Sequence, residues 1–93
     1  MQAGAYQNGT WVIGVAKCGN EEGVSQIGGS QIIAPSGQTI AMAATLADEL
    51  VVARCDLDFC RSYKTTIFNF AAHRRPEAYG LICETAGAIL PPA

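Results

Sequence analysis

The chain has 93 residues, of which 49% are hydrophobic and only 15% are charged, and its formal net charge at pH 7 is −2. This length allows one domain at most, and such a domain buries only about 60 to 65% of its unfolded surface. The weakly acidic balance excludes a basic surface for nucleic acid or anionic lipid, and no apolar run is long enough to span a bilayer. Neither nucleic acid nor membrane is therefore expected as a partner.

The first elements follow from the N-terminal sequence. MQAGAYQNG contains helix-forming residues and a glycine at position 9, which predicts a helix that begins upstream of Met1 and ends at Gly9. Residues 11–16, WVIGVA, are apolar without alternation, which indicates a strand buried on both faces. Residues 19–30 are rich in Gly, Ser and Asn, and we expect a long loop there.

The remaining elements alternate between strands and short helices. Residues 30–45 predict a hairpin, because proline and glycine at positions 35 and 37 suit a turn between two strand-like runs. Residues 48–58 predict a strand that feeds a short helix through residues 59–63, with Asp56 or Asp58 as its cap. Pro76 predicts the start of a last helix over residues 76–82, followed by a flexible tail over residues 83–93.

The cysteines favour no metal site. They lie at irregular spacings without a C-x-x-C pair, and His73 has no second ligand at a metal-binding spacing. The N-terminus lacks the basic and apolar regions of a secretory signal, so we expect a cytoplasmic protein with reduced thiols. Metal or disulfide use remains the alternative for the four positions, Cys18, Cys55, Cys60 and Cys83.

Three motifs resemble those of one family. Residues 28–37 match the hairpin pattern G-x-S-x-I-x-x-P-x-G, residues 56–61 read DLDFCR, and residues 74–80 read RRPEAYG. Together they resemble the C-terminal part of the nitrilase, or carbon-nitrogen hydrolase, superfamily, in its carbamoylase branch and closest to N-carbamoyl-D-amino-acid hydrolases. The segment MQAGAYQNG also resembles the interface helix of that family, so the resemblance covers residues 1–82.

The resemblance implies a fold and a reaction. The fold is α/β: residues 1–93 would be one partial domain, the C-terminal portion of a four-layer α-β-β-α sandwich with mostly antiparallel strands and short helices. The reaction is hydrolysis of an N-carbamoyl amino acid by a Glu/Lys/Cys triad, without a cofactor. In relatives the triad lies upstream of the segment that this chain resembles. No catalytic residue is therefore expected here, and the substrate belongs to the complete enzyme.

The resemblance also places candidate interface residues at both ends of the chain. Tyr6 and Asn8 lie in the interface helix, and the terminal signature supplies Arg74, Arg75, Pro76 and Tyr79. We expect them to contact a second subunit of a homo-oligomer, or the N-terminal part of the hydrolase; an anion site at the two arginines is the less favoured alternative. A second hypothesis for the whole chain is a non-catalytic interaction or dimerisation module that stands alone.

Overall fold

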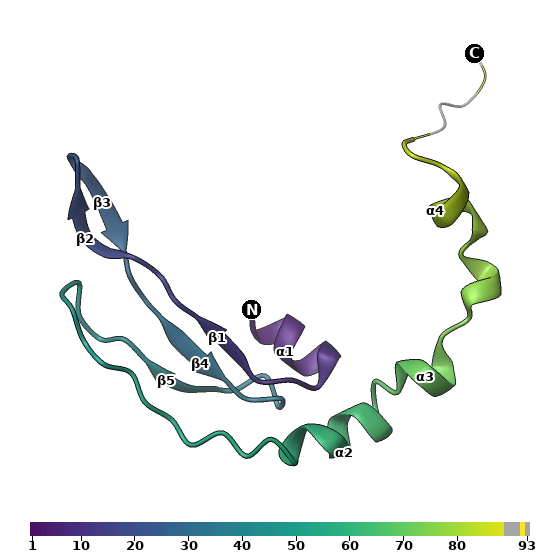
Figure 1. The fold of residues 1–93 in the computed structure, drawn as a ribbon, viewed down its shortest axis with the longest axis horizontal. Helices are drawn as coiled ribbons and strands as arrows, with labels where there is room; N and C mark the ends of the chain where they lie inside the picture. The colour runs from purple at the N-terminus through teal and green to yellow at the C-terminus, as the bar shows by residue number, and fades with distance from the viewer. Residues whose placement is uncertain (89–91, 93) are drawn as a thin grey trace.

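The computed structural model describes residues 1–88 and 92. The described elements form an open crescent, with two small sheets in one limb and a string of short helices in the other (Figure 1). The chain extends over 52 × 42 × 15 Å with a radius of gyration of 19.1 Å. A compact domain of this length would have a radius of gyration of about 12 Å. The chain is therefore much more open than a compact domain, and its shortest dimension, 15 Å, is that of a single layer.

Helix α1 spans Gln2–Asn8 and confirms the predicted helix end. Gly9 takes the left-handed conformation, with φ of 56°, and its backbone N–H donates to the carbonyl of Tyr6. The N–H of Thr10 donates to the carbonyl of Ala5, so two of the four carbonyls that the helix end leaves without an intrahelical partner are satisfied. Glycine is suited to this position because it has no Cβ to oppose a positive φ.

The main sheet is antiparallel and has the order β1-β4-β5. Strand β1 spans Val12–Gly14, β4 spans Gln31–Ile33 and β5 spans Thr39–Met42. The predicted hairpin over residues 30–45 is confirmed, and Gly37 forms its turn with φ of 85°. The prediction that the first strand is buried on both faces is wrong, because Ile13 of β1 is 65% exposed.

A second hairpin occupies the region for which the sequence predicts a loop. Strand β2 spans Cys18–Glu21 and pairs antiparallel with β3, Val24–Ile27. The two residues between them, Glu22 and Gly23, both have positive φ, 51° and 81°. A turn with two positive φ values matches the twist of the strands it joins, and glycine at its second position makes it accessible. The predicted loop is therefore wrong.

The segment over residues 48–55, here named the edge segment, belongs to no sheet. The sequence predicts a strand over residues 48–58, and this prediction is wrong because no described strand pairs with this stretch. No backbone-to-backbone hydrogen bond among the described residues involves it. Its side chains nevertheless alternate from Val51 to Cys55 between partly buried and exposed, as they do in a strand. The backbone is extended like that of a strand, but no neighbouring strand among the described residues forms backbone hydrogen bonds with it.

Helix α2 spans Phe59–Thr65, as predicted, but its N-terminus is built differently. Asp58 occupies the cap position without a side-chain cap hydrogen bond. The carboxylate of Asp56 instead accepts from the backbone N–H of Asp58 at 3.0 Å, which forms a turn just before the helix. The predicted capping role is therefore wrong for Asp58, and Asp56 stabilises the preceding turn.

The arm, residues 66–88, continues from α2 as a string of short helices. Helix α3, Phe70–His73, is an element for which the sequence analysis makes no prediction. The helix predicted over residues 76–82 divides into a 3-10 turn, Pro76–Ala78, and helix α4, Gly80–Glu84. Pro76 does occupy the first turn, as predicted. Helix α4 takes up the first two positions of the predicted tail, and residues 89–91 and 93 lie outside the described residues.

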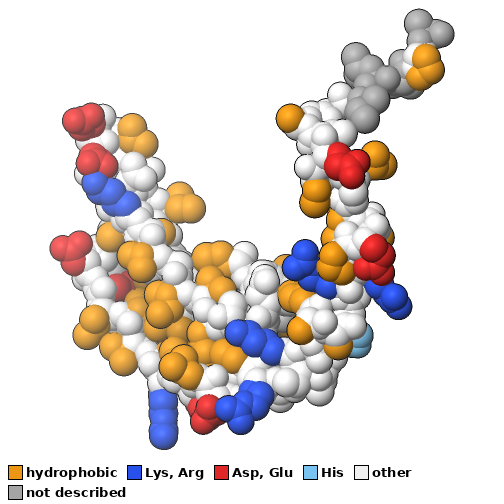
Figure 2. All heavy atoms as spheres, turned by 45° about the vertical axis from the view of Figure 1, so that its right-hand side comes forward, with side chains coloured by type: hydrophobic (Ala, Val, Ile, Leu, Met, Phe, Trp, Pro, Cys, Tyr) orange, Lys and Arg blue, Asp and Glu red, His pale blue; other side chains and the backbone are white. Residues whose placement is uncertain are grey.

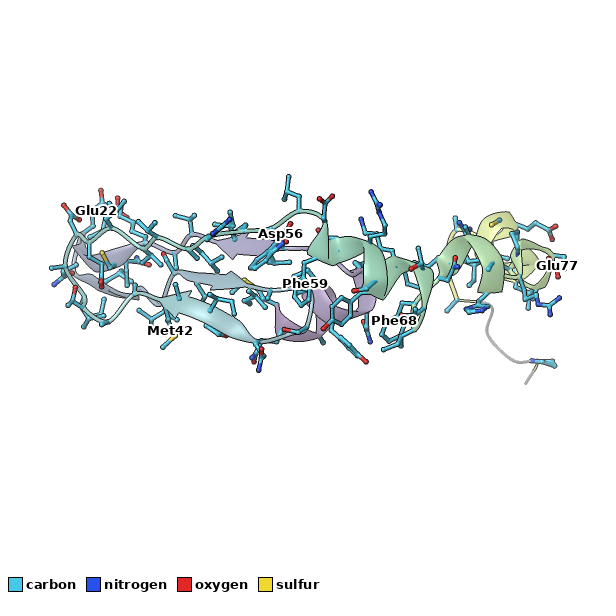
Figure 3. The ribbon with its side chains drawn as sticks, turned by 90° about the horizontal axis from the view of Figure 1, so that it is seen from below. Glu22, Met42, Asp56, Phe59, Phe68 and Glu77 are labelled. Atoms are coloured by element: carbon cyan, nitrogen blue, oxygen red, sulfur yellow. The ribbon has the colours of Figure 1, made fainter. Side chains whose placement is uncertain are left out.

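Aromatic side chains join the two limbs of the crescent. The Tyr6 ring on α1 packs edge-on against Phe68 and Tyr63, with centroids 5.1 and 6.1 Å away. Phe59 packs edge-on against Tyr63 at 5.3 Å, and it lies beside Trp11 at 6.4 Å. The labelled Phe59 and Phe68 lie where the limb of the sheets meets the limb of the helices (Figure 3). Edge-on arrangements of this kind are the favoured geometry for aromatic pairs. This aromatic cluster fixes α2 to α1 and to the start of β1.

Little of the chain is buried. The buried hydrophobic residues are Ala5, Ile32, Ile33 and Ala34, all from α1, β4 and the turn that follows β4. Large apolar side chains are exposed on the strands, the edge segment and the arm (Figure 2). The total exposed surface is 7348 Å², whereas a folded monomer of this mass exposes about 5,100 Å². In the described residues, no helix combines the length and the apolar character that crossing a bilayer requires.

Candidate functional site

A groove of about 300 Å³ lies between the main sheet and the start of the edge segment. Its walls come from Val15 and Ala16 after β1, from Cys18 of β2, from the glycines and serine at 28–30, and from Ala43, Thr45, Ala47, Asp48, Glu49 and Val51. The turn of positive-φ glycines at 28 and 29 lets the backbone pass close to Cys18, whose Cβ lies 3.2 Å from where a side chain at Gly28 would begin. Residues 28–30, at the end of the segment predicted as a loop, therefore line a groove.

Ser30 holds one wall of the groove in place. Its hydroxyl accepts from the backbone N–H of Ala16 at 2.8 Å and donates to the carbonyl of the same residue at 3.3 Å. Both backbone groups of Ala16 are thus satisfied beyond the end of β1. Because the hydroxyl is occupied by backbone partners, its role in the groove is structural.

Cys18 is the thiol of the groove. Its sulfur donates to the carbonyl oxygen of Ala47 at 3.5 Å. A carbonyl oxygen accepts the thiol proton but does not remove it, and a nucleophilic cysteine needs a base or a nearby cation to form the thiolate. No lysine, arginine or histidine is among the residues that line the groove, and the carboxylate of Glu49, which does line it, is hydrogen-bonded to Thr45. The geometry therefore gives Cys18 a hydrogen-bonded, structural position.

The carboxylate of Glu49 is fixed at the mouth of the groove by Thr45. It accepts from the Thr45 backbone N–H at 2.7 Å and from the Thr45 hydroxyl at 3.0 Å. The backbone hydrogen bond from Thr45 is the main reason that the pKa of Glu49 lies below its ordinary value of 4.5. The contact closes a turn that directs the chain from β5 into the edge segment.

The contact between Thr45 and Glu49 should weaken in acid. Because the folded-state pKa of Glu49 is lowered, the stabilisation is complete above pH 4.5 and is lost as the pH falls through the lowered pKa. We expect the amide proton resonance of Thr45 to shift in this acidic range in a pH titration by NMR. In the Glu49→Gln variant the transition should disappear, and a transition centred above pH 4.5 would contradict the assignment.

Within the described residues, no group of three or more His, Cys, Asp or Glu side chains is placed to hold a metal ion. Cys18, Cys55, Cys60 and Cys83 are free thiols. Cys60 lies in the first turn of α2, where the DLDFCR motif places it at the junction of the edge segment and the helix.

The predicted interface residues of α1 differ in their surroundings. Tyr6 packs within the aromatic cluster of its own chain, so its ring is only partly available to a partner. Asn8 is exposed, and its side-chain amide donates to the carbonyl of Gly4 at 2.9 Å, inside the helix. Asn8 also lines a hollow of about 230 Å³ with residues 68–71 and Lys64. This hollow separates the end of α1 from the start of the arm.

The terminal signature forms a compact local structure on the arm. The guanidinium of Arg74 lies over the Tyr79 ring at 5.9 Å from its centroid, and the Tyr79 hydroxyl accepts from the backbone N–H of Arg75 at 3.4 Å. Arg75 also lies 3.8 Å from the carboxylate of Glu77, with both side chains mostly exposed. Pro76 starts the 3-10 turn that brings Tyr79 back to the arginines.

The two groups of predicted interface residues stay apart. No hydrogen bond, ion pair or aromatic contact joins Tyr6 or Asn8 to the terminal signature in the part of the chain that the structure describes.

The groove contacts of Glu49 and Cys18 are absent from the sequence predictions. The spacing of a threonine and a glutamate four residues apart, in TLADE, is the local signal of such a turn, but it is masked by the strand prediction that begins at Asp48.

The chain matches a known protein family. The family model described as carbon-nitrogen hydrolase matches residues 1–65. This range contains α1, both sheets, the edge segment and α2, and it ends where the arm begins.

Proposed function

The chain belongs to the carbon-nitrogen hydrolase family, and we propose that it forms part of a hydrolase that cleaves N-carbamoyl amino acids. Within the family we place it in the carbamoylase branch, near the N-carbamoyl-D-amino-acid hydrolases. The motifs over residues 56–61 and 74–80, which resemble those of that branch, support this placement. In this proposal the chain contributes scaffold and assembly contacts, and the complementary part of the enzyme supplies the reacting groups.

The observation that carries the proposal is the open, single-layer structure. The sheet exposes large apolar side chains such as Ile13 and Ile40, and the arm exposes Leu81 and Ile82. Apolar area on this scale is stabilised only when another layer covers it. A four-layer α-β-β-α sandwich would supply such layers. We therefore propose that the chain is the C-terminal portion of that sandwich, completed by an N-terminal part and by a second subunit.

The proposed chemistry needs groups that the groove does not bring together. A cysteine thiolate attacks the carbamoyl carbon, a glutamate acts as the general base, and a lysine ammonium stabilises the oxyanion. Ammonia leaves, and water then hydrolyses the thioester-like intermediate to a carbamate, which releases carbon dioxide and the amino acid. In Cys18 and Glu49 the chain has a thiol and a carboxylate, but each is bonded to backbone groups of its own chain. We therefore assign the triad to the complementary part.

Fragment complementation tests this proposal. The 93-residue chain is mixed with the triad-bearing N-terminal part of an N-carbamoyl-amino-acid hydrolase that lacks its own C-terminal segment, and ammonia release is measured. We expect neither component alone to hydrolyse an N-carbamoyl amino acid, and the mixture to do so. Cys18→Ala and Cys60→Ala variants should restore the same activity as the unmodified chain, because neither thiol is the proposed nucleophile.

The outcomes separate the alternatives. Activity restored toward a nitrile or a simple amide, but not toward the carbamoyl substrate, would keep the family and reject the branch. Tight binding without turnover would favour the non-catalytic module.

Replacing Arg74 and Tyr79 together by alanine should leave the binding of the N-terminal part intact and reduce the size of the complex in sedimentation, if these residues contact a second subunit as we propose.

We also propose a cytoplasmic setting, which the four free thiols support.

A further inference from the structure

One asparagine of the chain is followed directly by a glycine. Asn8 and Gly9 form this pair, whereas Asn20 precedes a glutamate and Asn69 precedes a phenylalanine. Asparagine is among the thermolabile residues of proteins, because the backbone nitrogen of the next residue attacks its side-chain amide carbon. Glycine leaves that nitrogen unhindered, since it has no side chain and its backbone adopts conformations that are closed to other residues. By local chemistry, Asn8 is therefore the most reactive of the three asparagines.

The structure keeps the two reacting groups of this pair apart. Asn8 is exposed in the last turn of α1, and its side-chain amide donates to the carbonyl of Gly4, one turn back along the helix, at 2.9 Å. Gly9 is buried, and its backbone N–H donates to the carbonyl of Tyr6 at 3.2 Å. The amide carbon of Asn8 is thus held toward the start of the helix, while the nitrogen that would attack it is hydrogen-bonded and covered.

Packing against α2 keeps the end of α1 in this state. A Cβ built on Gly9 would lie 3.0 Å from Cγ of Lys64 and 3.1 Å from Cβ of Tyr63, so the backbone of Gly9 lies directly on α2. The ring of Tyr6 adds edge-on contacts with Tyr63 and with Phe68. Helix α1 has only seven residues, and an isolated helix of this length is unstable in water. Its last turn therefore opens when α1 leaves α2.

We propose that Asn8 is a self-modification site whose reaction is gated by the docking of α1 on α2. Once the last turn of α1 opens, the backbone nitrogen of Gly9 loses its proton to solvent and attacks Cγ of Asn8, which forms a cyclic imide. The side-chain nitrogen of Asn8 takes up a proton and leaves as ammonia. Water then opens the ring. Attack of water at Cγ gives aspartate, and attack at the backbone carbonyl carbon gives isoaspartate, in which the main chain runs through the side chain.

Either product opposes the return of α1 to its docked state. A carboxylate cannot donate to the carbonyl of Gly4, and its negative charge lies at the C-terminus of the helix, where the helix dipole disfavours it. Isoaspartate also lengthens the main chain directly before Gly9, whose positive φ and close contacts with α2 depend on the native spacing. The modification therefore accumulates on chains in which α1 is undocked. This goes beyond the proposed function, because the reaction requires only water and residues of this chain.

The rate of deamidation tests the gating. The 93-residue chain is incubated at neutral pH, and the tryptic peptide of residues 1–17 is followed by mass spectrometry, with isoaspartate detected by enzymatic methylation. We expect Asn8 to react about tenfold or more slowly than in the same chain unfolded in urea. Tyr6→Ala, which removes both aromatic contacts of α1, should raise the rate in the folded chain about fivefold or more. Tyr79→Ala, the same change on the arm, should leave it unchanged.

A variant that carries one product tests the second half of the proposal. Asn8→Asp removes the hydrogen bond to the carbonyl of Gly4 and places a negative charge at the end of α1. We expect hydrogen exchange of the Gly9 amide to become about threefold faster or more. Asn20→Asp, the same change on the β2–β3 hairpin, should leave this exchange unchanged. Exchange at Gly9 that is equal in both variants would show that the product does not oppose docking.

A further measurement on the unmodified chain covers a Tyr6→Ala variant that fails to fold. Hydrogen exchange of the Gly9 amide reports the opening that deamidation needs, because both reactions use the same nitrogen. In increasing urea below the unfolding transition, this exchange and the deamidation of Asn8 should accelerate by the same factor. Equal deamidation rates in the folded and unfolded chain, an unchanged rate in a folded Tyr6→Ala variant, reaction at Asn20 or Asn69 in place of Asn8, or different responses of exchange and deamidation to urea would each overturn the proposal.

Discussion

Replacing Gly9 by alanine should lower the free energy of unfolding by about 2 to 5 kcal/mol. Gly9 has φ of 56°, and the left-handed conformation costs a residue with a Cβ about 1 to 2 kcal/mol. A Cβ at this position would lie 3.0 Å from Cγ of Lys64 and 3.1 Å from Cβ of Tyr63. Because the Tyr63 contact is close to the backbone of α2, relief requires the helix to move, which adds about 1 to 3 kcal/mol.

The change at Gly9 has a matched control in the same helix. Gly4 lies inside α1, and a Cβ there would meet nothing within 4 Å. Gly4→Ala should therefore be neutral or stabilise the chain by about 0.5 to 1 kcal/mol. Urea unfolding followed by the fluorescence of Trp11 reports both changes, because Trp11 lies in the aromatic cluster between the limbs. Equal midpoints for the two variants would show that α1 does not pack on α2 as described.

Truncating Ile33 to alanine should cost about 2 to 4 kcal/mol in the free energy of unfolding. The side chain of Ile33 is fully buried at the end of β4, and it pairs with Val12 on one side and Thr39 on the other. Removing three carbons there loses burial and leaves a cavity that the surrounding residues fill only in part. Chemical denaturation, monitored by the loss of strand signal in circular dichroism, measures the effect.

Ile27 provides the comparison for Ile33. Its side chain is 87% exposed at the end of β3, so Ile27→Ala should change the stability of the monomer by less than about 0.5 kcal/mol. The cost at Ile33 should be the same at all protein concentrations, because its neighbours belong to the same chain. A cost at Ile27 that grows with concentration would instead show that association covers the β2–β3 hairpin. A small effect at Ile33 would contradict the core described for the main sheet.

The open architecture has a direct consequence for catalysis. Acyl transfer needs a nucleophile, a base and oxyanion donors that converge in a pocket from which water is largely excluded. The groove beside the main sheet is open, and the hydrogen bonds of its thiol and of its carboxylate point to the backbone of Ala47 and Thr45. In the proposed function the chain therefore supplies surfaces for assembly, and the hydrolase activity requires the complementary part.

Local patterns predict the elements that depend on local chemistry. The glycine at position 9 ends α1 because the left-handed position follows directly from the helix end. The turn at Pro35 and Gly37 defines the main hairpin for a similar reason, and the motif before Phe59 leads into α2. The motifs also place the chain in its family, which the match over residues 1–65 supports independently.

The sequence predictions fail where neighbouring strands or covering layers decide the structure. Residues 19–30 have a loop-like composition, yet β2 and β3 pair because a two-residue turn at Glu22 and Gly23 brings two polar strands together. The edge segment has the β-branched residues of a strand, but it has no ladder because a strand exists only beside another strand. An apolar run such as residues 11–16 predicts burial, but it does not specify which layer covers it.

The candidate site shows the same difference between features that depend on local sequence and features that depend on distant contacts. The sequence by itself determined the end of α1, the turn of the main hairpin, the start of α2 and the family, since each rests on short motifs. Only the tertiary structure decided that Cys18 meets Ala47 across 29 positions, that Trp11 meets Asp56 across 45, and that the edge segment stays unpaired. Contacts between distant residues depend on how the whole chain closes its loops, and no local pattern records that closure.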